Sequence, residues 1–180
     1  VAEVTTNRHI GRSIQMARDY LARHPEAARY TDSAARAVVE DGLHCRVEGP
    51  DAGAIHTDMP TGIGGTSSAP SPGWYFRASQ ASCEATLICM RAAELGIPLQ
   101  GVEVVVDSES DDRGILALDD ELPAGPLSVA TRVWISADGV EPQVLRELVE
   151  WADQYSPVSD VLRRVVPTGT QVEAATARLG

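Results

Sequence analysis

The order of elements that the sequence predicts is that of an α+β protein. Residue patterns indicate a helix, three strands, a long helix, two or three further strands, two helices and a last strand, with no internal repeat. The 180 residues suit a single domain, and 43% hydrophobic with 23% charged residues is ordinary for a globular chain. We therefore expect one α+β core.

An N-terminal helix is predicted over residues 7–24. Apolar residues recur there at helical spacing, Asn7 is placed to cap the first turn, and Pro25 stops the pattern. We interpret residues 1–30 as an N-terminal helical extension and residues 31–180 as the main domain.

A β-hairpin is predicted to follow this helix. Two β-type runs within residues 33–47 flank Asp41-Gly42, the dipeptide that most strongly indicates a hairpin. Residues 54–59 add a third strand to this interpretation. The glycine- and proline-rich segment 60–72 predicts a loop that crosses from the sheet to the next helix.

The most informative segment runs from Gly73 to Gly96 and predicts a long helix. Its periodicity is followed by a stop signal, Gly96 with Pro98 two residues later. Many of its residues are small, so other elements can approach it closely, as expected for a helix inside the fold. Cys83 stands near its middle. Residues that share a face with Cys83 are Phe76, Ser79, Gln80, Thr86, Leu87 and Met90.

The remaining third of the chain is predicted to contain strands and helices in turn. These are strands at residues 102–107 and 127–136, an extra strand at residues 115–118, helices at residues 142–155 and from Pro157, and a last strand at residues 171–175. The charged segment 108–114 is interpreted as a solvated loop. The alternative is that Asp111 or Arg113 in this loop reaches a ligand pocket.

The charge and the cysteines exclude several classes of function. A formal net charge of -11 disfavours nucleic acid and anionic membrane as partners, and no run of about 18 apolar residues is present to span a bilayer. The N-terminus does not resemble a secretory signal, so the cytoplasm is the expected compartment. All 15 basic residues are arginine, which excludes lysine Schiff-base chemistry.

Three cysteines without a Cys-x-x-Cys pair argue for reduced thiols rather than a disulfide scaffold or a structural zinc site. His44, Cys45 and His56 were weighed as metal ligands. Because strand alternation puts His44 and Cys45 on opposite faces, we expect no metal and no cofactor.

The loop motif Asp58-Met-Pro, Gly64-Gly65 and Pro72-Gly73, leading into a helix with Cys83 near its middle, resembles the OsmC/Ohr family over roughly residues 35–172. This resemblance implies an intertwined homodimer in which antiparallel sheets wrap around two long central helices. It also implies a thiol-dependent peroxidase that reduces organic hydroperoxides.

The resemblance assigns a role to four positions. Cys83 corresponds to the peroxidatic cysteine, and Arg36, in Arg36-Ala-Val-Val-Glu-Asp-Gly42, to the arginine that activates it. The family's glutamate, which holds this arginine, is replaced by Gly73, and its resolving cysteine by Ser156. With no carboxylate at residue 73, Asp58 and Glu84 are the candidates to hold the arginine.

These replacements imply a one-cysteine cycle. The thiolate attacks a peroxide, and an ordinary thiol is mostly protonated at neutral pH, so Cys83 is expected to need a cationic neighbour. Without a resolving cysteine, an external thiol must regenerate it. The residues expected to line an apolar substrate pocket are Ser156, Trp74, Phe76 and Thr86.

Other interpretations of the same residues stay open. Taken alone, Cys83 fits a small buried core residue, and Arg36 fits a surface charge. Ser156 fits a helix N-cap, and the aromatic pair Trp74 and Phe76 fits packing in the core or at a dimer interface. The alternative functions are a non-catalytic binder of a small hydrophobic ligand with the same fold, and a divergent thiol enzyme acting on a sulfur-containing or acyl substrate.

Overall fold

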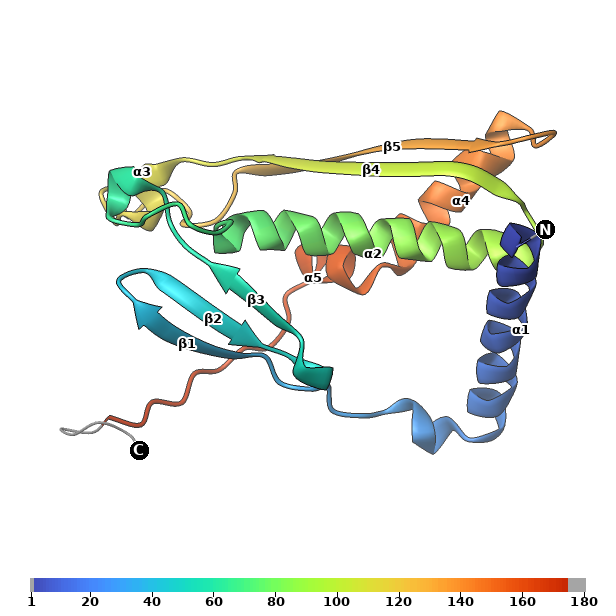
Figure 1. Cartoon of the computed structure of the whole chain (residues 1–180), viewed down its shortest axis with the longest axis horizontal. Coiled ribbons are helices and arrows are strands. Elements are labelled where there is room, and N and C mark those ends of the chain that lie inside the picture. The colour runs from blue at the N-terminus through green and yellow to red at the C-terminus, as the bar shows by residue number, and fades with distance from the viewer. Residues whose placement is uncertain (1, 175–180) are drawn as a thin grey trace.

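The computed structural model describes residues 2–174, and within them it has an α+β fold with two antiparallel sheets. The predicted fold class is confirmed. The helices are α1 (Ala2–Arg23), α2 (Pro72–Leu95), α3 (Asp112–Ile115), α4 (Pro142–Tyr155) and α5 (Pro157–Arg163). The strands are β1 (Arg36–Asp41), β2 (His44–Glu48), β3 (Ala54–Thr57), β4 (Leu99–Glu109) and β5 (Ser128–Ala137). Figure 1 shows β4 and β5 running along one side of α2, with β1, β2 and β3 on the other.

The first helix is longer than predicted. It begins at Ala2, so Asn7 lies inside it and the predicted cap at Asn7 is wrong. No proline or glycine precedes Asn7, so nothing in the sequence stops the helix from extending toward the N-terminus. The predicted end before Pro25 is confirmed, because α1 ends at Arg23.

Helix α1 crosses the C-terminal part of α2 (Figure 1). Gly11 lies directly against the backbone of Ala93, and a Cβ at Gly11 would stand 2.6 Å from the Ala93 carbonyl oxygen. Arg18 on α1 also forms an ion pair with Glu94 on α2. A residue other than glycine would therefore push the two helices apart. The division of the chain at residue 30 stays a prediction.

The predicted hairpin and third strand are confirmed as a sheet with the order β1-β2-β3. The two-residue turn follows Asp41, and Gly42 in it has a φ of 54°. The strand pairing places several apolar side chains on one face of this sheet. Val39 is 64% exposed and Ile55 is 42% exposed, so the described chain leaves this face largely uncovered. The members of this set are Ala37, Val39, Cys45, Val47 and Ile55.

The loop between β3 and α2 is organised around the buried carboxylate of Asp58. Its Oδ2 accepts hydrogen bonds from the N–H and Oγ1 of Thr66 (3.0 and 2.6 Å) and from the N–H and Oγ of Ser68 (3.0 and 2.9 Å). Oδ1 accepts the N–H of Met59 at 2.7 Å. These donors, the Thr66 hydroxyl first, hold the pKa of Asp58 far below its usual value. Asp58 thus fixes the loop that leads into α2.

We expect Asp58→Asn to lower the thermal unfolding midpoint by several degrees at pH 7, because an amide cannot accept all five hydrogen bonds. The depressed pKa stabilises the fold above the ordinary aspartate pKa of 3.8, and this contribution is lost as the pH falls below that value. Melting curves should therefore differ most above pH 4 and converge toward pH 2. The exposed Asp120→Asn is the matched control, and equal melting of both variants would contradict this role.

The long central helix is confirmed. The Ser71 hydroxyl caps it by accepting the N–H of Trp74, and Gly96 ends it in the left-handed region, with its N–H directed to the Ala92 and Ala93 carbonyls. One face of α2 packs on α4 and β4 and forms the core. The buried apolar side chains of this core are Ile88, Ala92, Ala93, Leu148 and Ala152.

The second sheet is the antiparallel pair of β4 and β5, which confirms the two predicted strands. The extra strand predicted at residues 115–118 is wrong. Asp111 accepts the N–H of Arg113 and caps the short helix α3 there, and short apolar runs do not distinguish helix from strand. The last predicted strand is also wrong, because residues 171–174 have no strand partner in the described chain; Ala175 lies outside it.

Helices α4 and α5 confirm the two predicted C-terminal helices. Both begin at a proline, Pro142 and Pro157, which is favoured at the first helical position.

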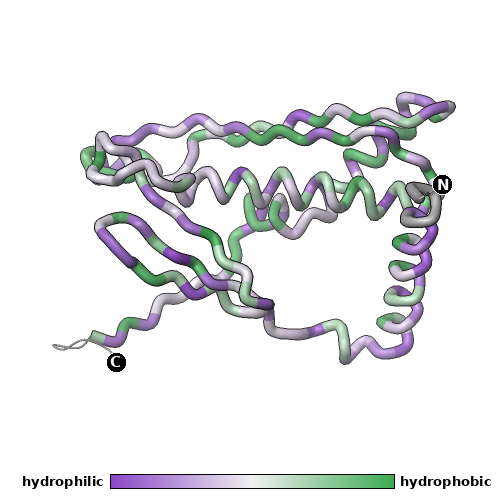
Figure 2. Tube along the Cα trace, viewed as in Figure 1, coloured by the Kyte–Doolittle hydropathy of each residue, from purple (hydrophilic) through white to green (hydrophobic). Residues whose placement is uncertain are grey.

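Hydrophilic and hydrophobic residues are mixed along α1 and α2 (Figure 2). Among the described residues, no helix is both long and apolar enough to cross a bilayer.

Candidate functional site

The structure brings Cys83 and Ser156 into contact although they are 73 residues apart. The Ser156 hydroxyl donates to the Cys83 Sγ at 3.3 Å. The same Oγ accepts the N–H of Ser159 at 3.2 Å, which caps α5 and fixes the hydroxyl in place. Ser156 is fully buried and Cys83 is half-buried. Ser156 therefore caps a helix and contacts the thiol at the same time.

This contact has a defined chemical effect. A hydroxyl at this distance can donate a hydrogen bond to a sulfur that carries negative charge. A hydroxyl cannot form a disulfide with an oxidised sulfur. Ser156 can thus assist a reactive cysteine but cannot resolve its sulfenic acid.

Arg36 lies on β1, and its partner in the chain is Glu48. The Arg36 Nη1 stands 3.1 Å from the Glu48 Oε2, and the Arg36 side chain is 69% exposed. Arg46 also pairs with Glu48, and these two arginines, Arg46 foremost, lower the pKa of Glu48. Within the described residues, Arg36 forms no hydrogen bond or ion pair with Cys83.

The carboxylates expected to hold Arg36 are engaged elsewhere. Asp58 is enclosed by its own loop, and Glu84 faces Asp153 and Arg163. Neither carboxylate holds Arg36 within the described residues of one chain, and an interaction with Glu84 from a second subunit stays a prediction. Glu48 holds the guanidinium because the β1–β2 register places it directly opposite Arg36.

The other predicted pocket residues form no hydrogen bond with Cys83 among the described residues of the single chain. Trp74 is 47% exposed and packs edge-on against Tyr75, with ring centroids 5.0 Å apart. Phe76 is half-buried and Thr86 is exposed. Of the predicted site residues, the structure joins only Cys83 and Ser156 directly.

The two remaining cysteines differ from Cys83 in their surroundings. Cys89 lies further along α2 as an exposed residue, and desolvation of its sulfur by neighbouring atoms raises the pKa of its thiol. Cys45 lies on β2, with its Sγ 3.9 Å from the Leu43 carbonyl oxygen. All three cysteines are free thiols.

A cleft of about 770 Å³ opens between α2, β5, α4 and α5. Its lining combines six apolar residues with eight polar or charged ones, which include the buried side chains of Gln80, Glu84 and Ser159. The apolar wall residues are Pro126, Leu127, Val129, Val133, Val149 and Leu162. The sequence analysis named Glu84 only as a partner for Arg36 and missed its place in this cleft; the spacing of Gln80, Glu84 and Ile88 along one helical face was the available signal.

Glu84 is a buried carboxyl group, only 2% exposed. Burial first and the charge of Asp153 second raise its pKa to about 7, and Arg163 opposes the shift. Gln80 donates its amide N–H to Thr131 at 3.2 Å. Among the described residues, the Gln80 Oε1 and the Ser159 Oγ have no hydrogen-bond partner. The cleft therefore offers polar groups that a ligand can satisfy.

Asp111 and Arg113 pair with each other at 2.6 Å in the loop after β4. Hydrogen bonds from Arg113 lower the pKa of Asp111 to about 2. Neither residue lines the cleft. The predicted loop is only partly confirmed, because Ser108 and Glu109 belong to β4 and Arg113 belongs to α3. A role of Asp111 or Arg113 in a pocket at a dimer interface stays a prediction.

The fold places the Ser156–Cys83 contact against one long central helix, α2. The OsmC-like protein family matches residues 65–171, more than half of the chain. The chain belongs to the OsmC-like family, as the sequence resemblance predicts.

Solved structures share the same fold at low sequence identity. An OsmC-like protein from Mycoplasma pneumoniae is 16% identical with a TM-score of 0.64, covering 76% of this chain and 91% of that one. An organic hydroperoxide resistance protein OsmC from Legionella pneumophila is 23% identical with a TM-score of 0.55, covering 74% of this chain and 90% of that one. An OsmC-like protein of unknown function from Vibrio cholerae is 11% identical with a TM-score of 0.61, covering 73% of this chain and 94% of that one. No curated protein matches the sequence.

Proposed function

We propose that this chain is a one-cysteine thiol peroxidase that reduces organic hydroperoxides with Cys83 and an external thiol. The observation that carries the proposal is the hydrogen bond from the buried Ser156 hydroxyl to the Cys83 Sγ. A hydroxyl donor at this position can interact with negative charge on the sulfur, and the thiolate is the form that attacks peroxides. The similarity to a protein named for organic hydroperoxide resistance supports the choice of substrate class.

The proposed cycle has three steps. The Cys83 thiolate attacks the terminal oxygen of the hydroperoxide; an S–O bond forms, the O–O bond breaks, and the leaving alkoxide takes a proton to become an alcohol. An external thiol attacks the sulfenic sulfur and forms a mixed disulfide with release of water. A second external thiol reduces this disulfide and returns Cys83 to the thiol.

The proposal includes a homodimer in which the partner supplies Arg36 to Cys83. Support comes from the apolar face of the first sheet, which the described chain leaves largely uncovered, and from the absence of any Arg36–Cys83 contact among the described residues of one chain. An arginine near the sulfur would stabilise the thiolate and the developing alkoxide. Glu48 is the carboxylate that orients it.

The test is peroxide reduction by the purified protein with cumene hydroperoxide and a monothiol reductant. We expect Arg36→Ala to lower the rate of Cys83 oxidation, followed by mass spectrometry, at least about 10-fold. Arg132→Ala is the matched control, because Arg132 is another exposed strand arginine paired with an acid, Asp107. Oxidation no faster than that of free cysteine, or equal rates for both variants, would contradict the proposal.

Gly73→Glu is expected to stabilise α2 and to increase the Cys83 oxidation rate several-fold. A Cβ at Gly73 would meet the Arg77 Nη1 and the Ser71 Oγ at 3.9 Å, an ordinary contact, so the position accepts a side chain. A carboxylate in the first turn of a helix contributes about 0.5 kcal/mol, and it would restore the family's arginine partner. Gly73→Gln is the uncharged control; equal rates in both variants would show that the missing carboxylate does not limit the reaction.

A second candidate function is binding of a small hydrophobic ligand without redox turnover. It is favoured by the cleft beside Glu84, whose volume of about 770 Å³ and six apolar wall residues can hold such a molecule. Titration with an environment-sensitive apolar dye would test it. Saturable binding that Val133→Asp abolishes, together with unreactive Cys83, would favour this function over the peroxidase.

A further inference from the structure

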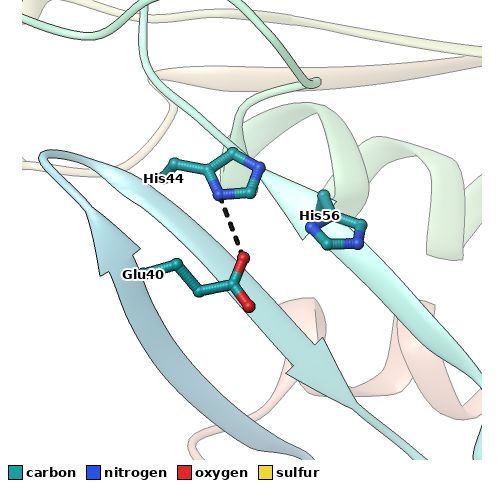
Figure 3. Close-up of side chains that lie close together, drawn as sticks. All are labelled: Glu40, His44 and His56. Carbon is teal, nitrogen blue, oxygen red and sulfur yellow. Dashed lines mark ion pairs between the residues drawn. The ribbon is translucent and has the colours of Figure 1, made fainter.

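Glu40, His44 and His56 meet on one face of the first sheet, away from Cys83. The β1–β2 and β2–β3 pairings set Arg46 opposite both Val38 and His56. His44 precedes Arg46 by two residues, so it shares the face of His56. Glu40 lies at the irregularity between Val39 and Asp41, and its ion pair with His44 brings its carboxylate to the same cluster. Figure 3 shows the Glu40 carboxylate reaching toward the two imidazole rings.

The three side chains are close enough to share one ion. One ligand atom from each residue lies within 4.8 Å of the others. The imidazole rings are 5.1 Å apart between centroids with planes 24° from parallel, and the Glu40 Oε2 stands 3.5 Å from the His44 Nδ1. Ligands of a tetrahedral zinc ion at 2.0–2.1 Å lie about 3.3 Å from one another. Small rotations of these partly exposed side chains would bring the ligand atoms from their present separation to the separation that zinc requires.

Arg46 binds only one of the two carboxylate oxygens of Glu40, so the other oxygen can bind a metal. Arg46 donates its Nε to the Glu40 Oε1 at 2.8 Å and pairs through Nη1 with Glu48. The Glu40 Oε2 faces His44 instead. Arg46 therefore keeps Glu48 as a partner when Glu40 binds an ion. Its hydrogen bond to Glu40 also orients the carboxylate, as the partners of metal ligands commonly do.

We propose that Glu40, His44 and His56 form a binding site for Zn²⁺ or a similar divalent transition metal. Two imidazole nitrogens with one carboxylate oxygen are ligands that zinc prefers, whereas Mg²⁺ and Ca²⁺ prefer sites made of oxygen atoms alone. Three protein ligands leave the fourth position of a tetrahedral ion to water. The ion would join all three strands of the first sheet.

This set of ligands differs from the one weighed from the sequence. Cys45 pairs with Thr57 on the opposite face and takes no part in the cluster. Glu40 completes the set because the strand register carries it beside His44 and His56. No step of the peroxidase cycle uses a metal, but Arg46 connects the two sites because it pairs with Glu40 and also with Glu48, the partner of Arg36.

The test is a zinc titration of the chelator-treated full-length protein by calorimetry, repeated with Co²⁺ by visible absorption. We expect one saturable site per chain, and a d–d spectrum of nitrogen and oxygen ligands without an intense thiolate band. His56→Ala and Glu40→Gln should each weaken binding at least about 10-fold. Zinc should also raise the unfolding midpoint of the unaltered protein, because it binds the folded sheet.

His24→Ala is the matched control. His24 also faces a carboxylate, with its Nδ1 3.4 Å from a Glu26 oxygen, but it belongs to no cluster of three ligands in the described chain. It should retain full affinity. Circular dichroism of all variants checks that the sheet is intact. Absence of a saturable site, unchanged affinity in His56→Ala, or a thiolate–cobalt band would overturn the proposal.

Discussion

Replacing Ser156 by cysteine is expected to change the product of Cys83 oxidation from a sulfenic acid to an intramolecular disulfide. The Ser156 Oγ already lies 3.3 Å from the Cys83 Sγ, so a thiol in its place is within reach of the oxidised sulfur after a small rotation. Because that thiol condenses with the sulfenic acid, conversion of Cys83 to sulfinic acid under excess peroxide should fall at least about 10-fold.

Intact-mass analysis after cumene hydroperoxide treatment measures this outcome. Ser156→Cys should lose two hydrogens, whereas the unaltered chain should gain one oxygen and then a second. Ser128→Cys, an exposed serine at the start of β5, is the matched control and should behave like the unaltered chain. Equal over-oxidation in Ser156→Cys and the control would show that residue 156 does not reach the reacting sulfur.

Replacing Glu84 by glutamine is expected to stabilise the fold above neutral pH. The folded chain holds a proton on Glu84 up to pH about 7, whereas an unfolded glutamate releases it near 4.5. The folded state therefore binds more protons between these values, and stability falls as the pH rises through them. The groups that face Glu84 across the cleft are Glu150, Asp153 and Arg163.

Glutamine has nearly the same shape as glutamate and carries no charge at any pH. The stability of the Glu84→Gln variant therefore does not fall as the pH rises through this range. Relative to the unaltered chain, it should gain about 3 kcal/mol of unfolding free energy between pH 5 and pH 8. Urea unfolding at the two pH values measures the difference. Glu150→Gln, at the exposed edge of the cleft, should show little change. A gain of equal size in both variants would contradict a neutral buried Glu84.

Local signals in the sequence predicted the elements of the fold well. Ser71, Pro72 and Gly96 bound α2 because capping and helix termination depend on residues that are adjacent in the chain. Asp41-Gly42 marked the hairpin for the same reason. Errors arose where tertiary structure decides the outcome, at residues 115–118 and 171–174, since short apolar or polar segments adopt whatever their neighbours allow.

The site was less accessible to sequence reasoning. The Ser156–Cys83 contact depends on how α5 packs against α2, and the family resemblance rather than spacing indicated it. The raised pKa of Glu84 depends on burial beneath α4 and α5. The Glu40–His56 proximity depends on strand register, which a shift of one residue would abolish.

Competition between the cysteines of one chain tests the central claim most directly. The unaltered protein would be treated with substoichiometric cumene hydroperoxide, trapped with a sulfenic-acid reagent, and mapped by peptide mass spectrometry. Cys89 is the exposed thiol and Cys83 the half-buried one, so accessibility alone would direct oxidation to Cys89. Our account predicts that Cys83 is labelled first and at least about 10-fold more than Cys89. Preferential labelling of Cys89, or equal labelling of both, would contradict it.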